Sequence, residues 1–517
     1  MFGDGIHCPM HVWDPSEGPV PYILAMDQGT TGSWAIVIAH DGTIKGSAYR
    51  ELAQRFPRAG WRRIRKRSGR PRWTSRSRRS SGRTCGRTIS LPSALPISVK
   101  QPSCGTAQRA RRSTRPSSGR TRRSADLCDR LRADGCEPLV QRRTGLQLDP
   151  YFSGTKVAWI LDHVPDVRRR AEDGTLAFGT VDSWLVWKLT GGRLHVTDPS
   201  NALRTMLFNI QTGRWDEELL RLFRIPAGLL PDVLGSSEVY GAITAVQGLQ
   251  QMPIGSLLGD QQAALFGQLC VSPGTTKNTY GTGCFLRQHI GDKPVASRHG
   301  LVTTVAWNIR ERMQYALEGS VLIGGAVVQW LRDGLGLIRS AAESETLARS
   351  VSDNGGVYFV PAFTGLGAPH WDPYARGLLV GLTRGTTFAH LARAALESIA
   401  YQVADVLDAM RDGSGFQVEE LRVDGGASRN DWLMQFQSDL LGLPVIRSTV
   451  TETTAQGAAY LAGLAVGFWT SQQEFAGRDR IEHRFEPQIL RGQATALRER
   501  WTAAVMRSKG WETSEHS

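Results

Sequence analysis

The chain has 517 residues, of which 41% are hydrophobic, and this length favours two domains with sizeable cores. It contains no apolar run of about 18 residues, no secretory signal and no C-x-x-C pair among its seven cysteines, so we expect a reduced, cytoplasmic protein without a membrane span, disulfide framework or zinc site. The net charge is +14, but residues 62–121 hold 18 of the 62 Lys and Arg and no Asp or Glu, so the remainder, with 44 basic and 48 acidic residues, is mildly acidic.

The first regular elements follow a short leader. Residues 1–21 look like extra sequence before a natural start at Met10 or later. Residues 22–38 predict two strands around the corner Asp27-Gln28-Gly29-Thr30-Thr31. Phosphoryl transfer needs backbone N–H groups and hydroxyls around phosphate oxygens, and a carboxylate that holds Mg²⁺ through water. This corner offers both, although an ordinary β-hairpin has the same pattern.

Residues 62–121 differ from the rest of the chain. They are rich in Arg, Ser, Pro and Gly and show little hydrophobic periodicity. Taken as written, they are typical of a disordered basic linker that could bind nucleic acid or an anionic membrane. A nucleic-acid-binding arm would have almost no stacking surface, because the segment has one Trp and no Tyr or Phe. We therefore expect no nucleic-acid partner.

The genetic code offers a third interpretation of this segment, which is translation in the wrong reading frame. With permitted codons, Ser90 to Gly105 read from the third base of the Ser90 codon give AAIGLTNQRETTIVW. The same offset turns Ile64–Gly69 into PEEIW and Pro116–Thr121 into IVWQD. At this one offset, the three shifted stretches resemble segments of a single protein family, in that family's order. This favours a frame change just after Trp61 and a second near Thr121.

Beyond residue 122, strand and helix patterns alternate. They predict a helix over 154–164, a hairpin over 301–319, a strand and glycine turn over 419–430, and helices over 321–338, 388–412, 431–442 and 453–468. Glycine-bearing strand turns at Asp27 and Asp424 lie far apart. We therefore expect an α/β protein with two related actin-like (ribonuclease-H-like) ATPase domains around a central cleft, with a boundary near residue 257.

A further carboxylate motif lies near this boundary. Gly259-Asp260-Gln261-Gln262 follows an apolar stretch and precedes a helix. A carboxylate at a strand end can accept the proton of a hydroxyl whose oxygen attacks phosphorus, although a helix-capping Asp would occupy the same place. The glycine loops Lys277–Gly283 and Val423–Ala427 could admit a nucleotide close to the backbone, although ordinary tight turns would look the same.

Taken in this order, the motifs resemble the FGGY family of carbohydrate kinases over Tyr22–Trp61 and from Arg122 to about Trp501. The stretches that carry the resemblance are YFSGTKVAWI at 151–160 and GLLVGLTRGTTFAHLARAALE at 377–397. Within the family, DPYFSGTK, GDQQAALFGQ, NTYGTGCF and FTGLGAPHWDPYARG are similar to kinases of glycerol rather than of xylulose or gluconate. The resemblance implies ATP-dependent phosphorylation of glycerol to glycerol 3-phosphate, with Mg²⁺.

The resemblance also implies roles for individual residues. Asp260 would be the general base on the terminal hydroxyl of glycerol, and Tyr151 and Gln261 would bind other hydroxyls. Asp27 would position Mg²⁺. The residues implied to contact ATP are Thr30, Thr31 and Thr282 at its phosphates, and Gly325, Gln329, Gly426 and Asn430 in the nucleotide site.

The chain departs from the family in three places. An N-Q-R-E motif whose Arg and Glu hydrogen-bond glycerol arises only in the shifted frame, from the codons of Ser98, Val99 and Lys100. Trp34 stands where the family usually has an Arg that contacts phosphate. The stretch GLQQMPIG lacks the Gly-Thr-Arg element through which some bacterial members bind fructose bisphosphate, so we expect that control to be absent.

The resulting domain prediction has four parts: an extra segment (1–21), an N-terminal domain (22–256, with the aberrant 62–121), a C-terminal domain (257–505) and a tail (506–517). The resemblance implies a homo-oligomer, either a dimer or a tetramer. Two alternatives stay open: an inactive, frameshifted relative, or an FGGY kinase of another polyol or sugar.

Overall fold

The computed structural model describes residues 22–29, 32–51, 96–99, 102–106, 123–296, 299–450, 452–476 and 481–512, with backbone alone at 96–99 and 102–106. Two predicted phosphate contacts, Thr30 and Thr31, lie outside the described residues, as does most of 62–121. Within the described part, no helix is both long and apolar enough to cross a membrane.

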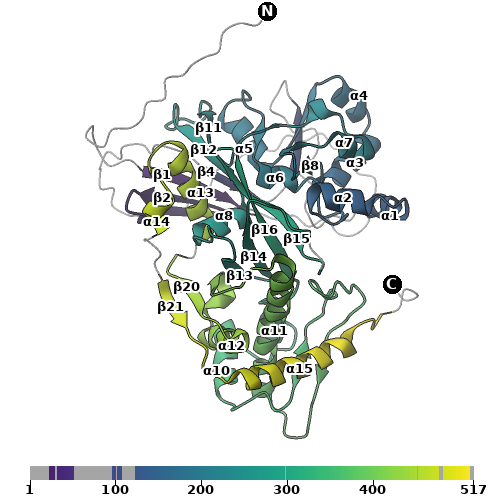
Figure 1. Cartoon of the computed structure of the whole chain (residues 1–517), viewed down its shortest axis with the longest axis vertical. Helices are drawn as coiled ribbons and strands as arrows, with labels where there is room; N and C mark the ends of the chain where they lie inside the picture. Colours follow the sequence, from purple (N-terminus) through teal and green to yellow (C-terminus); the bar gives the residue numbers. More distant parts are fainter. Residues whose placement is uncertain are drawn as a thin grey trace, which may run out of the picture.

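One mixed sheet of 13 strands runs through both lobes of the molecule (Figure 1). Its spatial order is β21-β20-β19-β13-β14-β16-β15-β11-β12-β4-β1-β2-β3. In chain order, the strands are β1 (Tyr22–Gln28), β2 (Gly32–Ala39), β3 (Ile44–Glu51), β4 (Pro96–Val99), β11 (Ser237–Ala242), β12 (Pro253–Gly259), β13 (Thr276–Tyr280), β14 (Cys284–Gly291), β15 (Val302–Ile309), β16 (Arg312–Val321), β19 (Leu421–Asp424), β20 (Val445–Ser448) and β21 (Ile481–Phe485).

The remaining strands form four separate pairs. These pairs are β5 (Pro102–Thr106) with β6 (Leu176–Thr180), β7 (Val196–Thr197) with β10 (Asp232–Val233), β8 (Phe208–Asn209) with β9 (Arg214–Trp215), and β17 (Tyr358–Val360) with β18 (Leu378–Val380).

The large sheet contains one arrangement twice, as β3-β2-β1-β4-β12 and as β16-β14-β13-β19-β20. In each copy, three antiparallel strands are followed by two strands parallel to the central one. Two related α/β domains are thus confirmed, and the strand order shows which of their turns correspond. The equivalent of the Asp27 turn after β1 is the loop after β13, whereas Asp424 ends β19, the counterpart of β4. Glycine turns look alike in sequence, and strand order alone distinguishes them.

The helices of the first half are α1 (Ala125–Ala133), α2 (Glu137–Thr144), α3 (Ser153–His163), α4 (Val167–Glu172), α5 (Val181–Leu189), α6 (Pro199–Leu203), α7 (Glu217–Phe223) and α8 (Asp260–Gly267), with the 3₁₀ turn η1 (Ala227–Leu229). Those of the second half are α9 (Ala326–Asp333), α10 (Ala341–Arg349), α11 (Phe388–Ser414), η2 (Gly426–Arg429), α12 (Asp431–Leu441), α13 (Thr453–Ala465), α14 (Gln473–Ala476) and α15 (Arg491–Ser508).

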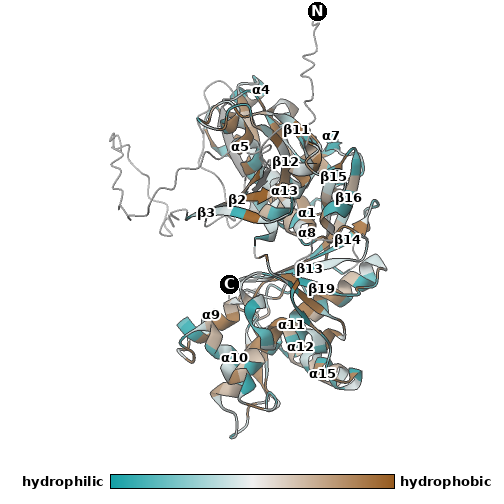
Figure 2. Cartoon of the chain, turned by 90° about the vertical axis from the view of Figure 1, so that its left-hand side faces the viewer, coloured by the Kyte–Doolittle hydropathy of each residue, from teal (hydrophilic) through white to brown (hydrophobic). Residues whose placement is uncertain are grey.

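Helix α13 crosses from the second half to the first. It packs on α8 and on the strands β1, β4 and β12, and Figure 2 shows both helices in the upper lobe, above the level of β13 and β19. The two helices approach closely because Gly267 and Gly457 face the opposite backbone, where an added methyl would overlap Thr453 and Ala263. The late segment of the chain therefore supports the strand ends of the first half.

Most predicted elements are confirmed with small boundary shifts. The hairpin over 301–319 is β15 and β16, and the helix over 388–412 is α11. The helix expected over 321–338 is wrong in length, because α9 spans only Ala326–Asp333. Val321 still belongs to β16, and Gly324-Gly325 form the turn between them. The apolar periodicity over 321–325 predicted burial, but it could not distinguish the end of a strand from the first turn of a helix.

Candidate active site

Two carboxylate positions meet at one edge of the sheet. The register pairs Gln28 of β1 with Val99 of β4, and Val99 with Gly259 of β12. Because β4 lies between β1 and β12, Gln28 and Gly259 are two strand spacings apart, roughly 10 Å. Asp27 and Asp260 are next to these residues, so the predicted metal ligand and the predicted base share one strand-end edge.

Asp260 is the first residue of α8, and the structure rejects its helix-capping interpretation. Gly259 holds the N-cap position with extended backbone, and no side chain caps the helix there. The Gly259 N–H donates to Ser200 Oγ at 2.8 Å, and Asp260 Oδ1 accepts from the Gln261 N–H at 2.8 Å. A carboxylate in the first turn is favoured by the helix dipole. The Asp260 side chain is half-buried, so a substrate can reach it.

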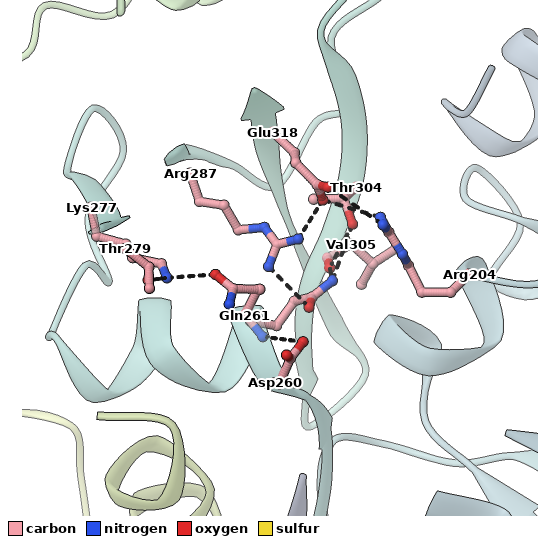
Figure 3. A network of polar contacts seen from close by, with 10 residues as sticks. Arg204, Asp260, Gln261, Lys277, Thr279, Arg287, Thr304, Val305 and Glu318 are labelled. Carbon is pink, nitrogen blue, oxygen red and sulfur yellow. Dashed lines mark hydrogen bonds and ion pairs between the residues drawn. The ribbon is translucent and has the colours of Figure 1, made fainter. Parts of the chain in front are cut away.

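A charged network around Glu318 adjoins the first turn of α8, which carries Asp260 and Gln261 (Figure 3). Glu318 of β16 forms ion pairs with Arg204, at 3.1 Å, and with Arg287. The Arg204 guanidinium lies 5.7 Å from the centre of the Tyr151 ring, and Arg287 donates to Gln262 Oε1 at 3.2 Å. The network therefore runs from Tyr151, before α3, to the first turn of α8.

The carboxylate at the centre of this network stays ionised. Burial by itself raises the pKa of Glu318, but the charges of Arg204 and Arg287 outweigh it and lower this pKa from 4.5 to about 2. Because the folded-state pKa is the lower one, the stabilisation is fully present above about pH 4.5 and is lost as the pH falls through 2.

We expect Glu318→Gln to lower the free energy of unfolding by about 3–5 kcal/mol, because the buried Arg287 and the half-buried Arg204 would lose their anion. Differential scanning calorimetry would measure the effect as a fall in Tm. The control is Glu217→Gln, whose carboxylate is 89% exposed and 3.8 Å from Arg221; we expect a change of about 0–1 kcal/mol there. Equal Tm values for the two variants would contradict the importance of the network.

The predicted nucleotide residues gather around one cavity of about 590 Å³. It lies between the loop after β13, the helices α9 and α10, and the turn η2. Its wall includes every predicted nucleotide residue that the structure describes: Thr282, Gly325, Gln329, Gly426 and Asn430. Sequence reasoning missed Arg332, Glu345 and Arg429, which also line it. These three have no motif signal, because helix and turn packing alone brings them to the cavity.

Glycines allow the segments around this cavity to approach closely. An added Cβ at Gly325 would lie 2.7 Å from the Gly281 carbonyl oxygen. Gly425 has a φ of +90°, which side chains rarely adopt. Gly426 differs, since a Cβ there would meet nothing within 4 Å. Asn430 has a second explanation, because its side chain accepts from the Leu433 N–H at 2.9 Å and caps α12.

We expect Gly426→Val to raise the KM for ATP about tenfold or more, because the branched side chain would occupy the cavity without disturbing its walls (a change of 1.4 kcal/mol is tenfold). The KM for the phosphoryl acceptor and the Tm should stay close to those of the parent. Steady-state kinetics with each substrate varied in turn would measure this. An unchanged KM for ATP would remove Gly426 from the nucleotide site.

The corner after β1 fits a magnesium ion held through one carboxylate. Asp27 is half-buried at the strand end, and the Gly29 N–H donates to the Gly32 carbonyl at 2.9 Å, which closes the corner. Among the described residues, no group of three or more His, Cys, Asp or Glu could hold a metal alone. Mg²⁺ suits such a place, because it keeps several waters and takes other ligands from phosphates. Nearby, the ring of Trp34 packs against that of Tyr49, with the ring centres 4.7 Å apart and the planes tilted by 39°. As an indole, Trp34 supplies no cation.

Two actin-like halves, strand-end carboxylates and a glycine-lined cavity define a phosphoryl-transfer enzyme of the sugar-kinase type. Residues 22–267 match the N-terminal domain of the FGGY family of carbohydrate kinases, and residues 276–466 match its C-terminal domain. The chain belongs to this family, which confirms the resemblance and the two-domain fold.

Three similar proteins are all glycerol kinases. The glycerol kinase of Koribacter versatilis is 56% identical over 497 residues, which cover 95% of this chain and 99% of that protein. The glycerol kinase of Deinococcus radiodurans is 52% identical, over 95% and 98%. The crystal structure of Plasmodium falciparum glycerol kinase with ADP superposes with a TM-score of 0.86 at 28% identity, over 95% and 98%.

Proposed function

We propose that this chain is a glycerol kinase, which transfers the terminal phosphoryl group of ATP to glycerol and forms glycerol 3-phosphate. Identity of 56% to a glycerol kinase, over almost the full length of both chains, carries the proposal. The geometry supports it, because Asp260 lies at the strand-end edge that Asp27 shares, and the nucleotide cavity opens beside the loop after β13. We propose a cytoplasmic location and a dimer or tetramer on the resemblance alone.

In this mechanism, Asp260 accepts the proton of the terminal hydroxyl as its oxygen attacks the phosphorus. Tyr151 and Gln261 bind the other hydroxyls and hold the reacting oxygen near the base. Asp27 would hold Mg²⁺ through water, and the ion would supply positive charge to the phosphate oxygens.

The phosphates of ATP are held by hydroxyls from both halves. Thr30 and Thr31 follow β1, and Thr282 follows β13, its topological equivalent. Gly325, Gln329, Gly426 and Asn430 hold the rest of the nucleotide. Closure of the halves excludes water, so that glycerol rather than water receives the phosphoryl group.

The register of β4 bears on the reading frame of residues 62–121. Ser98 pairs with Asp27 and Leu258, and Val99 pairs with Gln28 and Gly259. The codons of Ser98, Val99 and Lys100 are those that encode Arg and Glu in the shifted frame. Residues encoded there would lie between the two carboxylates, where a polyol needs hydrogen-bonding partners. We therefore propose that the active protein carries the shifted frame over this segment, and we name that form the frame-restored chain.

The proposed substrate is tested by comparing kcat/KM of the frame-restored chain for glycerol, dihydroxyacetone, xylulose and gluconate with saturating ATP. We expect glycerol to have the highest kcat/KM. A preference for xylulose or gluconate would favour a different FGGY kinase. No turnover of any of the four would favour an inactive relative.

A further inference from the structure

A buried lysine lies beside the proposed substrate site. Lys277 is the second residue of β13, and its side chain is fully buried. Its Nζ donates to Gln261 Oε1 at 2.8 Å and to Thr279 Oγ1 at 2.6 Å. Figure 3 shows this ammonium group pointing at the Gln261 side chain, next to Asp260. A strand of the second half thus contacts the first turn of α8.

This contact defines the orientation of the Gln261 carboxamide. A lysine ammonium group can only donate hydrogen bonds, so the atom that faces it must be the carbonyl oxygen. The amide NH₂ group then lies on the other side, and Gln261 is half-buried, so a ligand can reach it. Without Lys277 the amide could rotate and present either a donor or an acceptor.

Burial at this position disfavours a charged side chain. Burial lowers the pKa of Lys277 to about 8, while Asp424 and Asp260 raise it, Arg287 lowers it and Cys270 raises it slightly. The group is therefore still mostly charged at pH 7. Both of its hydrogen-bond acceptors are neutral, so the charge weakens the fold more than an apolar side chain of similar length would. A charge that does not stabilise the fold is typical of a functional group.

We propose that Lys277 is a positioning residue for substrate binding: it fixes the Gln261 carboxamide so that its NH₂ donates to the oxygen of a substrate hydroxyl. This inference rests on the proposed function and deepens it. The Gln261 subsite then requires an oxygen that can accept a hydrogen bond. The substrate hydroxyl keeps its own proton for a different acceptor.

The test is a double-mutant cycle of Lys277→Met and Gln261→Ala, made in the full-length form that turns over glycerol. Lys277→Met alone should raise the KM for glycerol about tenfold, because a charged partner of Gln261 is lost. The KM for ATP should stay within about twofold. In the Gln261→Ala background, Lys277→Met should cause no further rise, since Lys277 acts through that amide. The control is Lys188→Met, at an exposed lysine, with kinetics like those of the parent.

A merely structural role predicts a different outcome. With a positioning role, Lys277→Met should have a Tm equal to or above that of the parent, because a buried charge is removed. With a structural role, Lys277→Met would lower the Tm and change the KM for glycerol equally with Gln261 and with Ala at position 261. That result would overturn the proposal. Thr279→Val is a second variant that buries no new charge. It removes the other Lys277 acceptor and should raise the KM for glycerol about threefold, again only when Gln261 is present. If neither form of residues 62–121 turns over glycerol, the proposed function fails first and this inference fails with it.

Discussion

Asp260→Asn in the frame-restored chain should lower kcat about 10²–10⁴-fold, the range typical of a lost general base, and leave the KM for ATP unchanged. Asn has the same shape but cannot accept the proton of the attacking hydroxyl. The cavity assigned to the nucleotide is built from the second half and does not include Asp260. Initial rates with ATP and glycerol varied independently would measure both constants.

The control for that substitution is Asp166→Asn, at a carboxylate that is 74% exposed. Its backbone has a φ of +64°, which Asn tolerates, so its kcat should match the parent. A kcat of Asp260→Asn within about threefold of the parent would exclude Asp260 as the base, since even weak general-base catalysis contributes more than that.

The chain as written should have a kcat/KM for glycerol about 10²–10⁴-fold below that of the frame-restored chain. Two charged hydrogen-bonding partners of the substrate are missing, at about 1.5–3 kcal/mol each. The basic segment also replaces sequence that would form part of the first core, so we expect a lower Tm. Purification of both forms from the same host and side-by-side kinetics would measure the ratio.

Equal kcat/KM values in the two forms would contradict the frame assignment. The gene gives an independent check. Sequencing genomic DNA across codons 58–126 should show a base missing or extra near each boundary of the segment. If the bases stand as written, the family describes the ancestry of the chain rather than its activity.

Local patterns predicted most of the fold. The helix α11 was expected from apolar spacing within two residues of its observed ends, and the strand and glycine turn at Asp424 were expected as β19 and η2. Errors arose where tertiary context decides. The shortened α9 follows a strand that ends inside the expected helix. The equivalence of β1 with β13 was not predicted, because it depends on hydrogen bonding between strands distant in sequence.

The candidate site divides in the same way. The resemblance to the family, which rests on local motifs, named five residues of the nucleotide cavity but not Arg332, Glu345 or Arg429. The polar network could not be named from the sequence, because its contacts join distant residues. Arg204 and Glu318 are 114 residues apart, and Arg287 and Glu318 are 31 apart. Lys277 appeared in a motif, but only the folded structure brings its Nζ to Gln261.

The most direct test of the proposed reaction is phosphorus NMR of the frame-restored chain with ATP, Mg²⁺ and excess glycerol. We expect one glycerol 3-phosphate resonance that grows in step with ADP, with little inorganic phosphate, and almost no growth for Asp260→Asn. Formation of ADP and inorganic phosphate without a glycerol phosphoester would contradict it, because the enzyme would then transfer the phosphoryl group to water.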